Sequence, residues 1–216
     1  VFKGSEDFVG QIIHPQEWNS TIDYENKKVA VIGSGATAVT LVPQIAKEAS
    51  HVTMIQRSPT YIASVPSKYK ILHLLNYISP KFGYKIIRFI NILRQRRIYR
   101  RARRSPELVK DYLLGLVRDE LPDFDIEKHF TPSYNPWEQR LCLAPDSDFF
   151  ESIKQKRVSI ETETIDSFSE KGVQLDSGKL IEADIIVTAT GIKLQNFGGI
   201  RIFVDENEID ISKSFI

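Results

Sequence analysis

A glycine-rich turn between two short segments constrains this chain more than any other feature. Residues 28–32 read KVAVI, a continuous apolar run typical of a parallel strand buried on both faces. Gly33, Gly35 and Ala38 follow as Gly-x-Gly-x-x-Ala, and residues 36–49 carry apolar side chains at helical spacing. Residues 51–56 form a second β-rich run. Together they predict a strand, helix, strand unit with a right-handed connection.

This unit predicts a dinucleotide-binding turn. Gly33 permits the tight turn, Gly35 leaves room for a pyrophosphate, and Ala38 lets the helix lie close to the strand. Free N–H groups and the helix dipole at the helix N-terminus favour phosphate. The alternative is a turn that only reverses the chain. The predicted phosphate-binding residues are Gly33, Ser34, Gly35, Ala36, Thr37 and Ala38.

The residues after the second strand indicate which dinucleotide binds. An NAD site usually has an acid there to accept a hydrogen bond from the ribose hydroxyl, but residues 55–58 read IQRS. The Arg57 guanidinium suits a 2′-phosphate, and Ser58 offers a further hydrogen bond. We therefore predict NADPH as the cofactor. The alternative role of Arg57 is that of a solvated residue at a strand end.

The remaining pattern predicts an α/β protein, with a Rossmann-like parallel sheet, a helical insertion and a β meander. Residues 1–28 are predicted to be an ordered connecting segment. Helices are expected at residues 72–77 and 84–99, broken by Pro80 and Gly83, with Ile86, Phe89, Ile90 and Leu93 on one face. Ser105 and Pro106 predict a further helix start, and Asp148 with Glu151 resembles a capping box. From residue 158 the short alternating runs predict a meander, then one buried strand.

Composition excludes several classes. The 216 residues carry 29 Lys and Arg, 28 Asp and Glu, and one cysteine, Cys142; an internal disulfide and a four-thiolate zinc site are excluded. With no long apolar run and no secretory signal pattern, we expect a cytoplasmic protein. Because the sequence begins with Val1, we also expect it to be an excerpt of a longer protein.

Residues 68–104 hold twelve Lys and Arg and no acid. This basic segment is more often a solvated face, but it also suits an anionic membrane surface. Because no nucleic-acid-binding motif accompanies it, nucleic acid is not expected as a partner. The arginines concerned are Arg94, Arg96, Arg97, Arg100, Arg101, Arg103 and Arg104.

Phe8, Gly10, His14 and Trp18 stand at the spacing F-x-G-x-x-x-H-x-x-x-W, shortly before the glycine-rich turn. This fingerprint, in this order, resembles that of the Baeyer–Villiger monooxygenases. Trp18 favours that family over the related N- and S-oxygenating flavin monooxygenases. Further runs resemble the ethionamide-activating subgroup of the family: YNPWEQRLCLAPDSDFF, ADIIVTATGI and LQNFGG.

The resemblance implies two cofactors, NADPH and FAD, and a ketone or sulfide as substrate. In the family NADPH reduces FAD, and a flavin C4a peroxide inserts oxygen beside a ketone carbonyl or oxygenates sulfur. The family's active-site arginine corresponds to Arg140, which would stabilise the peroxyanion; the alternative is an ion pair with Glu138 or Asp146. Gln139 would face the 2′-phosphate. At the end of the last buried strand, the backbone of Ala189, Thr190 and Gly191 is expected to approach a second dinucleotide or to cross to the other domain; the alternative is a strand end that needs glycine only to turn.

The resemblance also implies a domain division. Residues 1–27 would be an inter-domain linker with the fingerprint, and residues 28–190 the NADPH-binding domain with a helical insertion at about 60–145. Residues 191–216 would begin the return to an FAD domain of the same polypeptide. Since the FAD-binding glycine motif is missing from these residues, we expect the segment alone to be inactive.

The other candidate residues are assigned structural roles. His14 is expected to act in structure and domain motion, and Cys142 to be a buried apolar residue without a base. His51, His73 and His129 lack partners at metal-ligand spacing, so no metal site is predicted. Two other functions stay open: an N- or S-oxygenating flavin monooxygenase, and a noncatalytic module that binds NADPH or a membrane surface.

Overall fold

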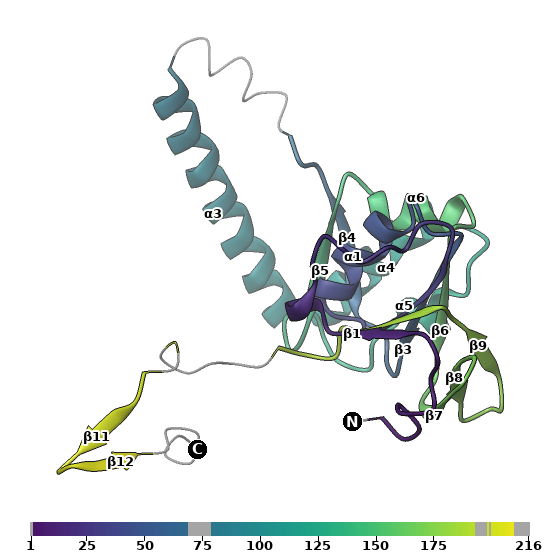
Figure 1. Cartoon of the computed structure of the whole chain (residues 1–216). Helices are drawn as coiled ribbons and strands as arrows, with labels where there is room; N and C mark the ends of the chain where they lie inside the picture. Colours follow the sequence, from purple (N-terminus) through teal and green to yellow (C-terminus); the bar gives the residue numbers. More distant parts are fainter. Residues whose placement is uncertain (1, 69–78, 193–197, 199, 210–216) are drawn as a thin grey trace.

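A five-stranded, fully parallel sheet forms the centre of the protein. The computed structural model describes residues 2–68, 79–192, 198 and 200–209 (Figure 1). The spatial order of the strands is β1-β10-β2-β3-β6. Their bounds are β1 (Gln11–Ile13), β2 (Lys28–Ile32), β3 (His51–Gln56), β6 (Val158–Thr162) and β10 (Ile185–Thr188).

Strand β2 is buried on both faces, as its apolar run predicts. Val29 and Val31 pack into the cluster that contains helix α1 (Ala36–Ile45). Ala30 and Ile32 point to the opposite face and join a second cluster. Because side chains alternate along a strand, a strand between two covered faces needs apolar residues at successive positions.

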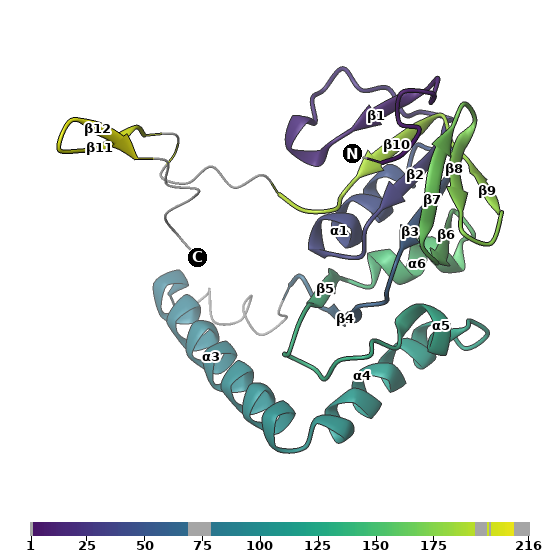
Figure 2. The same cartoon turned by 90° about the horizontal axis from the view of Figure 1, so that it is seen from below.

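Helices pack on one face of the parallel sheet and a second, antiparallel sheet packs on the other (Figure 2). Helices α1 and α6 (Asp148–Lys154) pack on one face through the first cluster. The other face is covered by an antiparallel sheet of β7 (Ile165–Ser169), β8 (Gly172–Leu175) and β9 (Leu180–Glu182). The predicted α/β class and meander are confirmed, although the predicted run 158–165 is divided, because β6 belongs to the parallel sheet.

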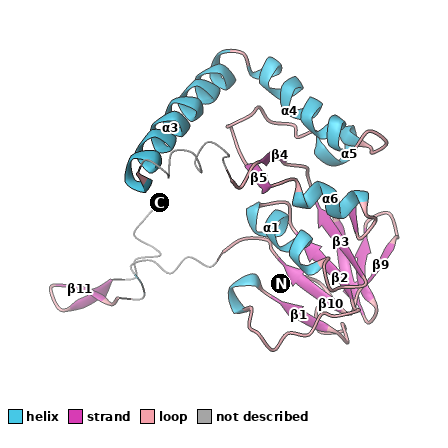
Figure 3. Cartoon of the chain, turned by 90° about the horizontal axis from the view of Figure 1, so that it is seen from above, coloured by secondary structure: helices cyan, strands magenta, loops and turns pink. Residues whose placement is uncertain are grey.

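A helical insertion follows β3, as predicted. It contains the parallel strand pair β4 (Tyr61–Val65) and β5 (Leu141–Pro145). Between these strands lie α3 (Pro80–Arg104), α4 (Pro106–Glu120) and α5 (Ile126–Phe130), drawn in Figure 3. Helix α4 begins at Pro106, the predicted start, and buries Val109 and Val117.

The prediction that Pro80 and Gly83 break the helix is wrong. Both lie in the first turn of the continuous helix α3, where a proline removes only an N–H that has no partner within the helix. The predicted apolar face is not core either, since Phe89 is 62% and Ile90 48% exposed. Helix α3 stands away from the body of the protein (Figure 1). The helix predicted at residues 72–77 lies outside the described residues.

The capping box predicted at Asp148 is also wrong. Ser147, with a φ of 60°, caps α6, and Asp148 is the first helical residue. The Asp148 carboxylate instead accepts a hydrogen bond from the amide of Phe149 at 2.8 Å. Helix α1 ends at Ile45, four residues before the predicted end at 49, because a turn follows.

Several short elements were not predicted. Besides β4, β5 and α5 they are strand β1, the 3-10 helix η1 (Pro15–Glu17) and the hairpin of β11 (Ile202–Val204) and β12 (Asn207–Ile209). Strands of three residues are too short to show a period. Residues 1–28 are therefore more than a connection, because β1 is the edge strand beside β10.

Candidate functional site

The glycine-rich turn connects β2 to α1. Gly33 has a φ of 133°, and its N–H donates to the carbonyl oxygen of Ile55 at 2.8 Å. A Cβ on Gly33 would lie 2.4 Å from the carbonyl oxygen of Ala189. The turn therefore crosses the end of β10 so closely that only glycine fits.

Gly35 has a different environment. It caps α1 with an extended backbone and no side-chain capping hydrogen bond. A Cβ there would meet no atom within 4 Å, so the space beside the helix N-terminus is open to a ligand. Ala38, fully buried, packs against the sheet. These observations match the requirements for a phosphate to approach the backbone.

A cavity of about 610 Å³ opens at this turn. It lies where β2, β3 and β10 end, the edge at which parallel sheets bind ligands. Its walls bring together ten of the predicted cofactor and catalytic residues: Gly33, Ser34, Gly35, Thr37, Arg57, Ser58, Arg140, Ala189, Thr190 and Gly191. Ala36, Ala38 and the exposed Gln139 do not line the cavity.

Arg57 is the exposed residue at the end of β3, whereas Ile55 and Gln56 are buried. The Gln56 amide donates to the carbonyl oxygen of His129 at 2.8 Å and to the hydroxyl of Thr162 at 2.9 Å. Ser58 is held by its carbonyl oxygen, which accepts from the Ser34 hydroxyl at 3.1 Å. Of the four positions considered for ribose recognition, Arg57 is thus the one with a charged group on the cavity wall.

Arg140 lies on the same cavity wall. Its carbonyl oxygen accepts from the Tyr134 hydroxyl at 2.8 Å and the Thr60 hydroxyl at 3.2 Å, which holds the backbone beside the cavity. The two acids considered as its partners are bound elsewhere, Glu138 by Asn135 and Asp146 by Ser67. Within the described part of the chain neither Arg57 nor Arg140 forms an ion pair.

The fingerprint runs along the sheet from one end to the other. Phe8 is buried in the second cluster, and a Cβ on Gly10 would lie 2.2 Å from the carbonyl oxygen of Asp184. After β1, His14 Nε2 lies 3.0 Å from the carbonyl oxygen of Gly191. Since Nδ1 accepts from the amide of Gln16 at 3.3 Å, the ring proton belongs on Nε2. His14 therefore ties the fingerprint to the Gly191 turn of the cavity.

Other chemistry-bearing side chains have structural roles. Trp18 packs against Tyr24. His51 pairs with Ser159 and His129 with Thr162, each at 2.8 Å. Burial raises the pKa of the Cys142 thiol, as expected of an unreactive cysteine.

No group of residues able to hold a metal ion occurs among those described, and His73 lies outside them. The LQNFGG run also lies mostly outside them. None of the described helices is long and apolar enough to span a membrane.

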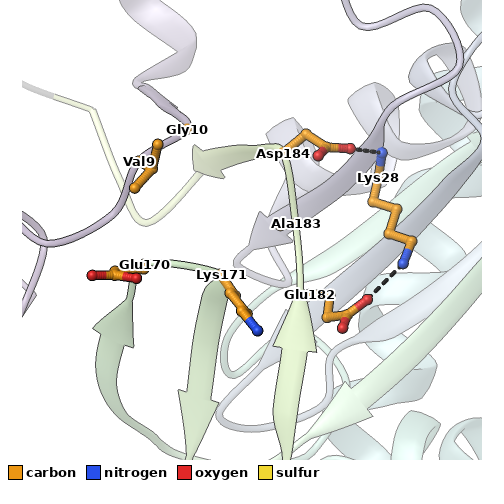
Figure 4. A pocket seen from close by; sticks show the side chains of 8 residues that line it. All are labelled: Val9, Gly10, Lys28, Glu170, Lys171, Glu182, Ala183 and Asp184. Atoms are coloured by element: carbon orange, nitrogen blue, oxygen red, sulfur yellow. Dashed lines mark hydrogen bonds and ion pairs between the residues drawn. The ribbon is translucent and has the colours of Figure 1, made fainter.

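A second pocket, of about 430 Å³, lies at the opposite end of the parallel strands (Figure 4). Lys28 there pairs with Glu182 at 2.6 Å, and its amide donates to Asp184 at 2.7 Å. The Lys28 and Glu182 charges neutralise each other, and the pocket holds none of the predicted cofactor-binding residues; Gly10 of the fingerprint is on its wall.

Sequence reasoning missed several residues of the cofactor cavity. They reach it from the N-terminal segment, from the residues between β6 and the start of β7, and from the position after Gly191. A signal was available only from topology, since β6 ends beside β3. The missed residues include Phe2, Glu163, Thr164, Ile165 and Ile192.

Comparison with known proteins finds relatives among the flavin-binding monooxygenases. The family model for flavin-binding monooxygenase-like proteins matches residues 1–87. The chain is 49% identical over 214 residues to the FAD-containing monooxygenase EthA of Mycobacterium tuberculosis, which covers 98% of this chain and 44% of EthA. It is 48% identical to the probable FAD-binding monooxygenase AlmA of Acinetobacter baylyi, over 100% of this chain and 44% of AlmA.

Solved structures share the fold. The OTEMO complex with FAD and NADP matches with a TM-score of 0.67 and 18% identity, over 89% of this chain and 44% of that chain. The open form of cyclohexanone monooxygenase matches with a TM-score of 0.66 and 20% identity, over 88% and 45%. The chain thus spans less than half the length of these relatives. Over nearly all its residues it is similar in sequence to one segment of FAD-containing monooxygenases, as the resemblance predicts, and it shares the fold of cyclohexanone monooxygenase.

Proposed function

We propose that this chain is the NADPH-binding portion of an FAD-dependent monooxygenase that inserts oxygen into ketones and also oxygenates sulfides. The observation that carries the proposal is the cavity at the ends of β2, β3 and β10. It combines an open phosphate-binding turn at Gly35 with two guanidinium groups that have no ion-pair partner among the described residues.

The residues present suit NADPH. The turn at 33–38 and the first N–H groups of α1 would hold the pyrophosphate. Arg57 and Ser58 would bind the 2′-phosphate, the group that a carboxylate at this position would repel. Gln139 is also proposed to approach the phosphate, although it is exposed and lies off the cavity wall. Ala189, Thr190 and Gly191 line the cavity at the third strand end, where their backbone would contact a bound dinucleotide.

FAD, when bound, supplies the oxygen-activating chemistry. We propose that the Arg140 guanidinium faces the reacting atoms and stabilises negative charge there, a preorganised electrostatic role. We also propose a division of the chain into domains. Residues 1–27 link the domains, 28–190 bind NADPH and include the insertion at about 60–145, and 191–216 lead back to the FAD domain.

The test uses the full-length protein with FAD and NADPH. We expect ester or lactone formation from ketones, followed by mass spectrometry. Arg140→Ala should lower ketone oxygenation about a hundredfold or more at saturating NADPH, because one positioned charge makes a contribution of this size to such reactions. Turnover of amines without turnover of ketones would instead support the N-oxygenating alternative. NADPH binding without any oxygenation would support a noncatalytic module.

Helix α3 supports a second property, peripheral contact with an anionic membrane. Its 25 residues include ten Lys and Arg and no acid. Phe82 is 53% and Phe89 62% exposed, and among the described residues no ion pair neutralises the helix. Near its end, Ala102 is buried and Tyr99 contacts Trp137, so the rest projects from the body (Figure 2). Exposed aromatics among cations suit a lipid headgroup region.

We expect the full-length protein to sediment with phosphatidylglycerol vesicles at low salt. Replacing Arg94, Arg97 and Arg101 with glutamate should weaken binding about tenfold or more, since each cation near such a surface contributes roughly 1 kcal/mol. In the control variant, glutamate replaces Lys3, Lys47 and Lys171, which are exposed basic residues outside α3. This variant should still sediment with the anionic vesicles. Equal sedimentation with neutral vesicles, or none with anionic ones, would contradict the proposal.

A further inference from the structure

The cofactor cavity contains one feature that works against a phosphate. Its charged lining side chains, within the described residues, are the guanidinium groups of Arg57 and Arg140 and the carboxylate of Glu163. Arg57 suits the additional phosphate of NADPH, whereas a carboxylate repels it. The sequence gives no reason to select Glu163, because it lies more than a hundred residues after Arg57.

Pairing of the parallel strands brings Glu163 to Arg57. Strand β6 lies beside β3, with Thr162 opposite Gln56. The next residue, Glu163, donates its N–H to the carbonyl oxygen of Gln56 at 2.9 Å. Glu163 and Arg57 are thus the residues that directly follow the last pair of the two strands. Glu163 and Arg57 therefore project from neighbouring strand ends on the wall of one cavity.

The Glu163 side chain is fixed in place and charged. Its Oε1 accepts from the amide N–H of Ser177 at 2.5 Å, in the turn after β8. Hydrogen bonds from the side chain and backbone of Ser177 hold the pKa of the Glu163 carboxyl below its usual range. The carboxylate is thus anionic at neutral pH. Within the described residues Glu163 forms no ion pair with Arg57 or any other cation.

We propose that Glu163 is a second determinant of cofactor selectivity, opposed to Arg57: its carboxylate weakens binding of the 2′-phosphate. This inference rests on the proposed function. Charges in one cavity interact over several ångströms, within the Debye length of about 8 Å at physiological salt. NADH lacks the 2′-phosphate, so the carboxylate should affect it far less.

The test measures the dissociation constants of NADPH and NADH for the full-length protein by calorimetry. Glu163→Gln keeps an acceptor for the Ser177 N–H but removes the charge. We expect it to bind NADPH about three- to tenfold more tightly, the range for a partly screened charge pair, and NADH within about twofold of the wild type. Higher salt should reduce the difference between the variant and the wild type.

Glu170→Gln is the matched control. Glu170 is exposed and lines the pocket at the opposite end of the parallel strands, so its replacement removes the same charge far from the cofactor cavity. It should leave the ratio of the two dissociation constants unchanged. If both glutamine variants shift that ratio equally, the effect belongs to net charge and the inference is overturned.

Other outcomes separate this inference from the function on which it rests. Equal weakening of both nucleotides by Glu163→Gln would mean that the carboxylate supports binding of the part that the two nucleotides share, and unchanged affinities would mean that it has no role; either result overturns the inference alone. A wild-type protein without preference for NADPH would overturn the proposed function and the inference together.

Discussion

Replacing Arg57 with alanine is expected to weaken NADPH binding about tenfold to a hundredfold or more and to leave NADH binding almost unchanged. The guanidinium lies at the end of β3 on the cavity wall, in the place where an NAD site has its acid. Each charge-assisted hydrogen bond contributes roughly 1.5 to 3 kcal/mol, and about 1.4 kcal/mol corresponds to a factor of ten in affinity. Calorimetry of the full-length protein with each nucleotide measures both constants.

Arg57→Lys is an informative control. It keeps the positive charge but loses the planar fork that binds phosphate with two parallel hydrogen bonds. Its NADPH affinity should therefore fall between those of the wild type and Arg57→Ala. Equal loss of NADPH and NADH in the alanine variant would show that Arg57 supports the fold of the cavity instead of selecting the phosphate.

Substitutions at the two glycines of the turn should have different effects, one on NADPH binding and the other on stability. Gly35→Val is expected to fold normally and to lose NADPH binding by at least about a hundredfold, because the side chain would occupy the space that the pyrophosphate needs. An added Cβ at Gly35 meets no protein atom within 4 Å, and the backbone φ of −82° suits any residue. A nucleotide titration and a thermal unfolding curve of the same sample separate binding from stability.

Gly33→Ala is the comparison variant. The new Cβ would lie 2.4 Å from the Ala189 carbonyl oxygen, and the φ of 133° is one that alanine rarely adopts. We expect the free energy of unfolding to fall by about 2 kcal/mol or more. The midpoint of thermal unfolding should fall even without nucleotide. A stable Gly33→Ala protein, or tight NADPH binding by Gly35→Val, would contradict this account of the turn.

The parallel sheet could be predicted because its strands are continuous apolar runs. Strands β2 and β3 begin and end at the predicted residues, 28–32 and 51–56. Helix α3 shows the limit of such patterns. Its apolar residues recur at helical spacing, yet Phe82, Phe89 and Ile90 stay exposed. Periodicity indicates that a helix forms, but it does not say whether another element covers the apolar face.

Some features of the candidate site could likewise be predicted from the sequence, and others could not. The turn at Gly33 and the charge of Arg57 are local features, and they were predicted from adjacent residues. The three-residue strand β1 and the approach of His14 to Gly191 were not, because they depend on pairing between residues about 170 positions apart. Glu163 was missed for the same reason, since only the register of β6 against β3 places it beside Arg57.

By itself the sequence determined the strand, turn and helix of the proposed dinucleotide site, the charged residue proposed to select the phosphate, and the fingerprint. These depend on backbone conformation and side-chain type over short stretches, which neighbouring residues control. Only the tertiary structure decided which distant side chains share the cavity, that the fingerprint is anchored on the sheet, and that α3 projects from the body. Those outcomes follow from strand order and packing between segments far apart in the chain, for which a local pattern carries no signal.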